Sequence, residues 1–531
     1  MVSRREFAEL ASLTVAGLVM PGPPYRTPQA VALEETTIAQ LQDGMKAGRL
    51  SARSVTQAYL DRIAALDRQG PSLRAVLETN PEALAIADGL DAERRRGKVR
   101  GPLHGIPVIV KDNIDTHDKM QTTAGSLALE GNIAVRDAFI VEKLRAAGAV
   151  ILAKANLSEW ANFRSNRSSS GWSGRGRQCR NPYVLDRTPS GSSSGSAVSV
   201  SANLCAVAVG TETDGSIISP ANTCGIVGVK PTVGLVSRAG IIPIAHSQDT
   251  AGPMARTVAD AAALLTALAG VDPRDPATAD AQVPVAKDYT AFLDAAGLKG
   301  ARIGVQARAG NNPIVDNVLE QAIAVLKAQG AEVVDPAPIE TAGQLGTNER
   351  DVLQYEFKAD LNAYLATMPA NVSVRTLADL IAFNSANEAR EMPYFGQETF
   401  IASQARGPLT EQAYIDARAK CIELTRTKGI DATMDKFKLD AMLGPSGGIA
   451  SLVDLAGGGG GGGGPASSQF PAVSGYPHIT VPAGFHFGLP LGVSFYGRAW
   501  SEPVLIRLAY AFEQATKARR APAFTPTIAL S

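Results

Sequence analysis

A glycine- and serine-rich stretch from Thr188 to Ile217, TPSGSSSGSAVSVSANLCAVAVGTETDGSI, constrains the fold of this chain more than any other segment. It contains two tight loops. Between them lie a segment that can form a helix and a short apolar run, Cys205 to Val209, that can form a buried strand. A helix that leaves the first loop and a strand that returns to the second bring the loops together. Active sites form in loops at the strand ends of α/β folds, so we expect Ser192 to lie near Ser216.

Lys111 ends a second apolar run, Ile106 to Val110, which has the composition of a buried strand. Burial disfavours the charged form of a lysine, so Lys111 is a candidate proton acceptor for the two serines. Taken singly, each residue has an ordinary structural interpretation: a lysine at the end of a strand, a serine that forms a turn, and a serine that caps a helix. The catalytic interpretation therefore depends on finding all three residues in one ordered pattern.

Helical patterns alternate with short apolar runs along most of the chain, which predicts an α/β sheet. The expected helices include 38–46, 51–68, 81–96, 137–147, 317–329 and 502–516, and the expected strands include 73–77, 149–153, 301–305, 331–334, 479–481 and 492–495. Residues 339–438 are mostly helical in pattern and more charged. An unbroken glycine run at 457–464 cannot pack, which predicts a flexible surface loop.

The N-terminus has the features of an export signal, in the expected order. Ser3-Arg4-Arg5-Glu6-Phe7 is a twin-arginine motif, Leu10 to Met20 is apolar, and Ala30-Val31-Ala32 is typical of a cleavage site. We expect residues 1–32 to be a signal peptide and the protein to be periplasmic or secreted. The apolar stretch is too short to span a bilayer, so we expect no stable membrane anchor. The alternative is an ordinary N-terminal helix with a chance arginine pair.

Charge and metal-ligand spacing exclude two classes of function. The chain has 51 basic and 51 acidic residues, whereas electrostatic nucleic-acid binding needs a basic patch, so we expect no nucleic-acid partner. The histidines are scattered and no C-x-x-C spacing occurs, so we expect no metal and no cofactor. Cys205 and Cys224 lie in apolar or glycine-rich runs and are expected to be buried thiols. Disulfide pairing stays open for the four cysteines, Cys179, Cys205, Cys224 and Cys421.

Several motifs together resemble the amidase signature family. The lysine motif of that family is matched at 105–112, its first serine loop at 189–195 and its nucleophile loop at 210–217; further matches lie at 224–232, 248–254 and 488–492. The resemblance runs from about Ile38 to Thr516 and keeps the order of the motifs, which makes it specific. It implies a large twisted mixed β-sheet covered by α-helices on both faces. The expected amidase domain is 33–531, with a catalytic core at about 100–260 and a helical substrate-side region at about 339–438.

The loops depart from the common family pattern in ways that resemble its peptide amidase branch. Ser190 and Ser194 replace glycines in the first loop, and in the second loop Glu212 and Asp214 replace an aspartate and a glycine. Ile218 stands where arginine is common. Together with the segment 156–162, these variants imply that the substrate is a small-molecule or peptide amide, with the C-terminal amide of a peptide the favoured case.

The resemblance also implies a role for each site residue. Ser216 is the expected nucleophile, Lys111 the expected base, and Ser192 the bridge between them. The expected oxyanion hole consists of four backbone N–H groups, those of Thr213, Asp214, Gly215 and Ser216.

Four alternatives stay open. A general aliphatic or aryl amidase would share the triad. The A subunit of a tRNA-dependent amidotransferase would share the family core, although an export signal disfavours that cytoplasmic role. Gly191 to Gly195 also fits G-x-S-x-G, the nucleophile elbow of α/β-hydrolases, which would make Ser193 the nucleophile of an esterase. The fourth alternative is an exported binding protein without catalysis. The tryptophans Trp160, Trp172 and Trp500 are expected to serve packing, and Arg164 to Arg180 is expected to be a solvated loop.

Overall fold

Leu33–Ser531 form one compact unit, which the computed structural model describes at residues 33–279, 285–306, 308, 312–458 and 466–528. The expected signal peptide, residues 1–32, and most of the expected glycine-rich loop at 457–464 lie outside the described residues, so both stay predictions. Within the described part, none of the helices combines the length and the apolar character needed to cross a bilayer.

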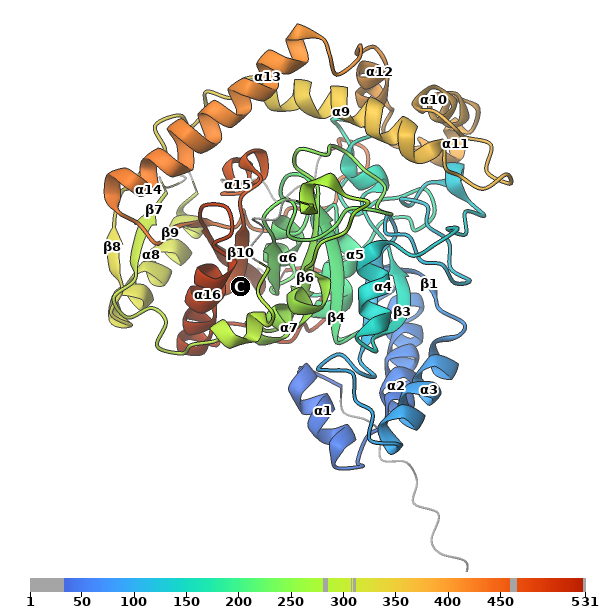
Figure 1. Cartoon of the computed structure of the whole chain (residues 1–531), viewed down its shortest axis with the longest axis horizontal. Helices are drawn as coiled ribbons and strands as arrows, with labels where there is room; N and C mark the ends of the chain where they lie inside the picture. Colours follow the sequence, from blue (N-terminus) through green and yellow to red (C-terminus); the bar gives the residue numbers. More distant parts are fainter. Residues whose placement is uncertain (1–32, 280–284, 307, 309–311, 459–465, 529–531) are drawn as a thin grey trace, which may run out of the picture. The chain divides into compact units, whose positions relative to one another are not determined.

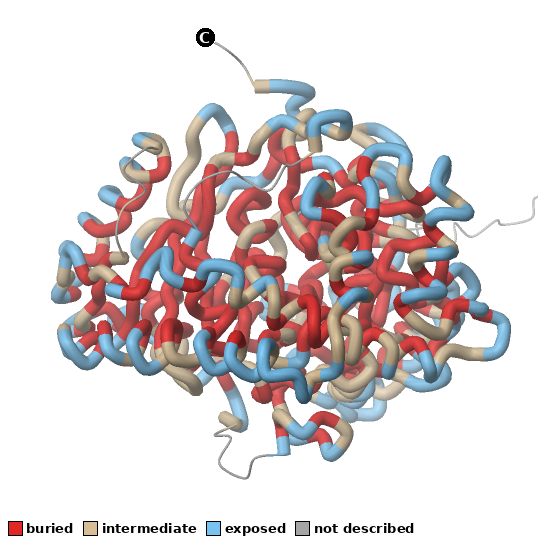
Figure 2. The backbone as a smooth tube through the Cα atoms, turned by 90° about the horizontal axis from the view of Figure 1, so that it is seen from above, coloured by how far each residue is buried: buried red, intermediate tan, exposed pale blue. Residues whose placement is uncertain are grey.

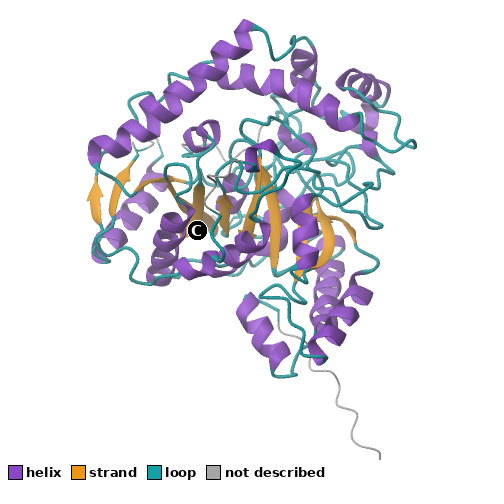
Figure 3. Ribbon diagram, viewed as in Figure 1, coloured by secondary structure: helices purple, strands orange, loops and turns teal. Residues whose placement is uncertain are grey.

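A mixed sheet of eleven strands runs through the centre of this unit, with helices on both sides (Figure 3). In sheet order the strands are β1 (Val76–Thr79), β3 (Val150–Ala155), β2 (Pro107–Lys111), β4 (Val207–Glu212), β6 (Thr250–Ala255), β5 (Val227–Lys230), β10 (His478–His486), β11 (Leu489–Tyr496), β9 (Ala441–Pro445), β7 (Arg302–Val305) and β8 (Glu332–Val334). β2 runs parallel to β3 and β4, whereas β10 runs antiparallel to β5 and β11. This sheet confirms the predicted fold class.

The central strands are apolar because helices cover them. Every residue of β2, β3 and β4 is buried, as the continuous apolar runs in the sequence predicted. Figure 2 shows buried backbone throughout the interior and exposed backbone at the periphery. Cys205 and Cys224 are buried thiols as expected, and Cys179 and Cys421 are buried thiols too.

Several of the helices begin at a residue whose side chain caps the first turn. The helices are α1 (Ile38–Lys46), α2 (Ala52–Ile63), α3 (Ala83–Arg95), α4 (Phe139–Ala146), α5 (Ser194–Ser201), α6 (Ile218–Thr223), α7 (Val258–Leu268), α8 (Pro313–Ala328), α9 (Asn348–Leu365), α10 (Leu377–Ala386), α11 (Glu388–Glu391), α12 (Glu398–Gln404), α13 (Gln412–Ile422), α14 (Asp431–Phe437), α15 (Gln469–Ser474) and α16 (Glu502–Thr516). The Ser51 side chain accepts a hydrogen bond from Ser54 N, which confirms Ser51 as the N-cap of α2.

The helices α9 to α14 form a cover over the sheet, and α9 and α13 run side by side along it (Figure 1). This arrangement confirms the mostly helical pattern expected for 339–438. An aromatic cluster anchors α9: Phe357 stacks on Phe400 of α12 with ring centroids 5.3 Å apart, and Trp160 packs edge-on against Phe400 at 6.0 Å. Burial of such aromatic side chains contributes most of the stability of a contact of this kind.

Two expectations differ from the structure. The strand expected at 73–77 is β1, which begins at Val76, because the buried Asp67 carboxylate accepts hydrogen bonds from Ala75 N and Val76 N and holds the preceding residues in a turn. The expectation of a solvated loop from Arg164 to Arg180 is wrong at 164–165, 169–174 and 179, which are buried. The Arg164 side chain is fully buried, 3.2 Å from Glu159 Oε1 and 4.4 Å from the Phe395 ring centroid.

Two of the tryptophans, Trp160 and Trp172, are buried as expected. Trp500 instead is half-buried and lines a cavity.

Candidate active site

Lys111 lies at the end of β2, where strand pairing places it beside the end of β4. The register pairs Val110 with Val209, so that the lysine lies beside Thr211. Its Nζ atom donates hydrogen bonds to Ser192 Oγ at 2.8 Å, Thr211 Oγ1 at 2.8 Å and Thr211 O at 3.2 Å. The structure therefore brings the expected base into direct contact with the expected bridging serine.

Burial sets the protonation of this lysine. The side chain is completely buried, and this desolvation lowers the pKa of Lys111 to about 7, although the negative charges of Asp249 and Glu212 act in the opposite direction. Neutral amine and ammonium are then both populated near neutral pH. Lys111 is thus able both to take a proton and to return it.

The two serine loops lie side by side, as the sequence predicted. Ser193 N donates to Ser216 O at 3.0 Å, and the hydroxyls of Ser190 and Ser219 are 2.7 Å apart. Ser192 is 1% exposed and Ser216 is 8% exposed. Among the described residues no hydrogen bond joins the Ser192 and Ser216 hydroxyls, so the first link of the expected relay is formed in the structure and the second is not.

Glu212 shapes the loop that carries Ser216. Its Oε2 atom accepts hydrogen bonds from Ile217 N at 2.7 Å and Ile218 N at 2.9 Å, and it thereby ties the start of α6 to the end of β4. Gly215 has a φ of 73°, a left-handed conformation that favours glycine. Glutamate at position 212 is thus a loop-closing residue.

The turn before α6 exposes a row of backbone donors. Within the part of the chain that the structure describes, the backbone N–H groups of Thr213, Asp214, Gly215 and Ser216 have no protein acceptor. Unpaired donors of this kind stabilise the negative oxygen of a tetrahedral intermediate. The geometry is therefore compatible with the expected oxyanion hole.

Thr213 is held by residues that sequence reasoning did not assign to the site. Thr213 Oγ1 donates to Asp249 Oδ1 at 2.5 Å, and Gln248 Nε2 donates to Thr213 O at 3.2 Å. The pairing of β4 with β6, which sets Thr211 opposite Ala251, brings the Asp249 end of β6 beside Thr213. The signal was present, because Gln248 and Asp249 lie in a matched motif, but their partner depends on strand pairing.

Ser193 has structural partners in place of catalytic ones. It is completely buried, and its Oγ atom donates to Thr211 O at 3.0 Å and accepts from Thr211 N at 3.2 Å. No strand among the described residues leads directly into it, whereas a nucleophile elbow follows a strand. The geometry therefore does not favour the esterase alternative.

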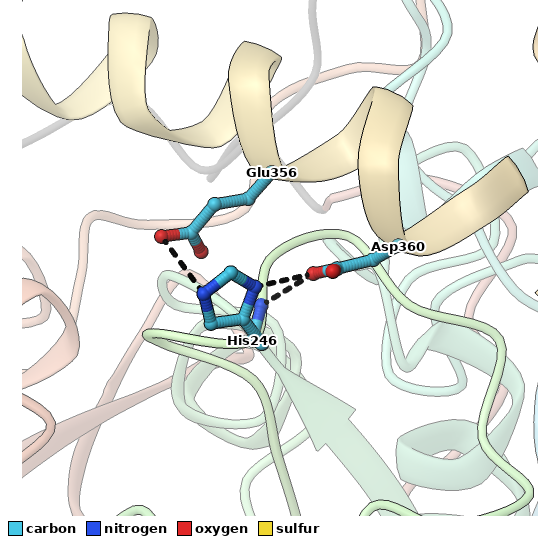
Figure 4. Close-up of side chains that lie close together, drawn as sticks. All are labelled: His246, Glu356 and Asp360. Carbon is cyan, nitrogen blue, oxygen red and sulfur yellow. Dashed lines mark hydrogen bonds and ion pairs between the residues drawn. The ribbon is translucent and has the colours of Figure 1, made fainter. Parts of the chain in front are cut away.

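His246 lies between two carboxylates of α9 (Figure 4). Its Nδ1 atom is 2.8 Å from Asp360 Oδ2 and its Nε2 atom 3.5 Å from Glu356 Oε1. These side chains are the only group of three in the described part whose ligand-type atoms all lie within 4.8 Å of one another. Because the two ring nitrogens face different carboxylates, the arrangement suits an ion-paired imidazolium better than a metal ion. Glu356 also accepts from Tyr414 Oη and Ser247 N.

A cavity of about 400 Å³ is lined by Thr211, which accepts hydrogen bonds from the lysine. Its polar lining residues include Asn113, Thr211, Thr213 and Asp249, and its apolar lining includes residues 241–244. Ser192 and Ser216 are not among its lining residues. The cavity thus reaches the residues that hold Lys111 and Thr213, beside the two serine loops.

Three comparisons with known proteins give the same family. The Amidase family model matches residues 54–506. A probable amidase from Arabidopsis thaliana is 43% identical over 508 residues, which cover 94% of this chain and 93% of that protein. A putative amidase from Schizosaccharomyces pombe is 38% identical over 536 residues, which cover 94% of this chain and 88% of that protein. The crystal structure of native peptide amidase from Stenotrophomonas maltophilia superposes with a TM-score of 0.87 at 53% identity, covering 92% of this chain and 99% of that chain.

Proposed function

This chain belongs to the amidase signature family and is an amide-hydrolysing enzyme, and on that premise we propose that it releases ammonia from primary amides through Lys111, Ser192 and Ser216. The observation that carries the proposal is the 2.8 Å hydrogen bond between the buried Lys111 amine and Ser192 Oγ. An amide is a poor electrophile with a poor leaving group, so its hydrolysis needs an activated nucleophile, an oxyanion site and a proton donor.

Each residue has one role in the proposed reaction. Neutral Lys111 takes the proton of Ser192 while Ser192 takes the proton of Ser216, and Ser216 Oγ attacks the carbonyl carbon. The negative oxygen that forms is bound by the backbone N–H groups of 213–216, each worth roughly 2.7–4 kcal/mol of barrier. The proton returns through Ser192 to the amide nitrogen, the C–N bond breaks, and ammonia leaves. Water then hydrolyses the acyl ester on Ser216 and releases the carboxylic acid.

The substrate that we propose is the C-terminal amide of a peptide. Two observations support it: the loop variants at 190–194 and 212–218, and the 53% identity to a peptide amidase over 92% of this chain. A terminal carboxamide has a leaving group no larger than ammonia. Two tight loops that bury Ser192 and Ser216 have room for ammonia, whereas a peptide on the leaving side would need an open channel.

A pair of matched substrates tests this proposal. A peptide amide and the same peptide extended by one residue are incubated with the enzyme and with Ser216→Ala. We expect ammonia from the first substrate, no cleavage of the second, and no turnover by the variant. Efficient cleavage of the extended peptide, or activity confined to small aliphatic or aryl amides, would overturn the peptide amide assignment.

A further inference from the structure

A second cavity, of about 690 Å³, lies beside the segment formed by α13 and the π-type turn Glu423–Ile430. We call it the arginine cavity, because three arginines line it together with a histidine and two aromatic side chains: Arg238, Arg418, Arg426, His246, Tyr476 and Trp500. Its volume lies within the range of cavities that bind small organic ligands, about 300–1,000 Å³. It shares Arg238 and His246 with the cavity beside Lys111.

Two of its four basic side chains are already neutralised. Arg238 forms a bidentate ion pair with Asp275, with Nε 2.8 Å from Oδ2 and Nη2 2.5 Å from Oδ1. His246 is held between Glu356 and Asp360. These pairs leave no net positive charge on that wall of the cavity.

The other two basic side chains form no ion pair with a carboxylate in the part of the chain that the structure describes. Within the described residues, the side chain of Arg418, which projects from α13, makes no hydrogen bond and no ion pair. Arg426 donates from Nε to Ser474 O at 2.7 Å and lies 5.4 Å from the Tyr476 ring centroid, with no ion pair among the described residues. Burial lowers the pKa of Arg426 and the positive charge of Arg418 acts in the same direction, whereas Tyr476 and the Asp431 carboxylate, which accepts from Tyr476 Oη, act against them. No aspartate or glutamate is among the described residues that line this cavity.

We propose that the arginine cavity binds an organic carboxylate, which Arg418 and Arg426 hold by its oxygens while Tyr476 and Trp500 contact its apolar body. The planar guanidinium matches a carboxylate with two parallel N–H donors, which makes arginine suited to this class of ligand. An anion also removes the repulsion between two like charges in a partly buried place. Ser216 does not line this cavity, and the proposal does not depend on which amide the enzyme hydrolyses.

Trp500 provides a direct readout of binding, because the other two tryptophans are 2% and 1% exposed. Cyclohexanecarboxylate is titrated into the whole protein while intrinsic fluorescence is recorded, with cyclohexylmethanol as the uncharged counterpart. We expect a saturable change with the carboxylate, weaker at high salt, and none with the alcohol. The affinity should fall at least about tenfold in Arg418→Gln and further in Arg418→Glu, and return in part in Arg418→Lys.

Arg350→Gln is the matched control, because Arg350 lies exposed on α9 and does not line the cavity. Circular dichroism melting confirms that each variant is folded; Arg418 has no bonded partner to lose among the described residues. Equal binding of the alcohol, no saturable binding of the carboxylate, or equal affinities in the wild type and Arg418→Glu would overturn the proposal.

A second arm identifies the source of the carboxylate. Peptide amides with glutamate or leucine upstream of the amidated residue are compared in the wild type and in Arg418→Gln. A lower KM for the glutamate peptide that disappears in the variant assigns the site to an acidic side chain of the substrate. Equal KM values, together with saturable binding of cyclohexanecarboxylate, assign it to a free carboxylate. Both outcomes support a carboxylate site. Because the fluorescence titrations do not require turnover, they test this site even if the proposed amide hydrolysis is wrong.

Discussion

Thr213 Oγ1 donates a 2.5 Å hydrogen bond to Asp249 Oδ1, and this bond ties the loop that carries Ser216 to the segment that precedes β6. The same carboxylate accepts hydrogen bonds from Ile244 N and Ala245 N through its other oxygen. Asp249 also raises the pKa of Lys111, against the stronger effect of burial. One partly buried side chain therefore positions the expected oxyanion hole and adjusts the expected base.

Asp249→Asn should separate these two effects. Loss of the negative charge removes a group that favours the ammonium form, so the pKa of Lys111 should fall and the acidic limb of kcat/KM should move to lower pH. Asparagine has one acceptor oxygen in place of two, so either Thr213 Oγ1 or the Ile244 and Ala245 N–H groups lose their acceptor, which should lower kcat by about ten- to a hundredfold. A pH–rate profile measures both. Asp43→Asn, an exposed change on α1, should leave the profile unchanged, and an unshifted acidic limb in Asp249→Asn would contradict the electrostatic role.

Lys111→Ala and Ser192→Ala should each lower kcat by about a thousandfold or more, and the double variant should be little worse than either single one, because the two residues form one relay. In the wild type, kcat/KM should rise with pH through about 7, since only the neutral amine of Lys111 accepts a proton. Steady-state kinetics across pH check both statements. Additive losses in the double variant would show that the residues act independently.

His246 should contribute to stability in a pH-dependent way. In the folded state the pKa of His246 is raised above 6.5, and the hydrogen bond to Asp360 is the largest cause. The contacts of the charged imidazolium therefore stabilise the folded state below pH 6.5, the pKa in the unfolded chain. This stabilisation is lost as the pH rises through the higher pKa of the folded state. The stability difference between the wild type and His246→Asn should be largest at about pH 6 and smallest at about pH 9. Urea unfolding measures it, with His486→Asn as control. A stability difference between the wild type and His246→Asn that grows with pH would contradict this prediction.

Export is a prediction of the sequence alone. If residues 1–32 are a twin-arginine signal, mature protein should begin near Leu33, and replacement of Arg4 and Arg5 by lysine should keep the protein in the cytoplasm. N-terminal sequencing of protein recovered from the periplasm or the medium checks this. A cytoplasmic product that begins at Met1 or Val2 would refute the prediction.

Local sequence was enough to predict Lys111, Ser192 and Ser216 as site candidates, because each lies in a short motif at the end of a buried strand or in a glycine-rich loop. The contact between Thr213 and Asp249 was not predictable from a motif, since it depends on the antiparallel pairing of β4 with β6. Dependence on distant residues also explains why the burial of Arg164 was not predicted, since the charge of an arginine favours an exposed position.

The burial of Arg164 depends on Glu159 and on Phe395, which lies more than two hundred positions further along the chain. The fold class was predictable because helical and apolar segments alternate, whereas the order of the eleven strands depends on long-range pairing.

The identity of the nucleophile is the central claim, and mass spectrometry of a trapped acyl-enzyme tests it most directly. The enzyme is mixed with an activated ester, quenched during the first turnover, digested, and mapped for the acylated peptide. Ser193, buried against Thr211, provides the internal comparison, since both serines lie in the same site. We expect the acyl group on Ser216 and none in Ser216→Ala, while Ser193→Ala remains acylated at Ser216. An adduct on Ser193, or on no serine, would contradict it.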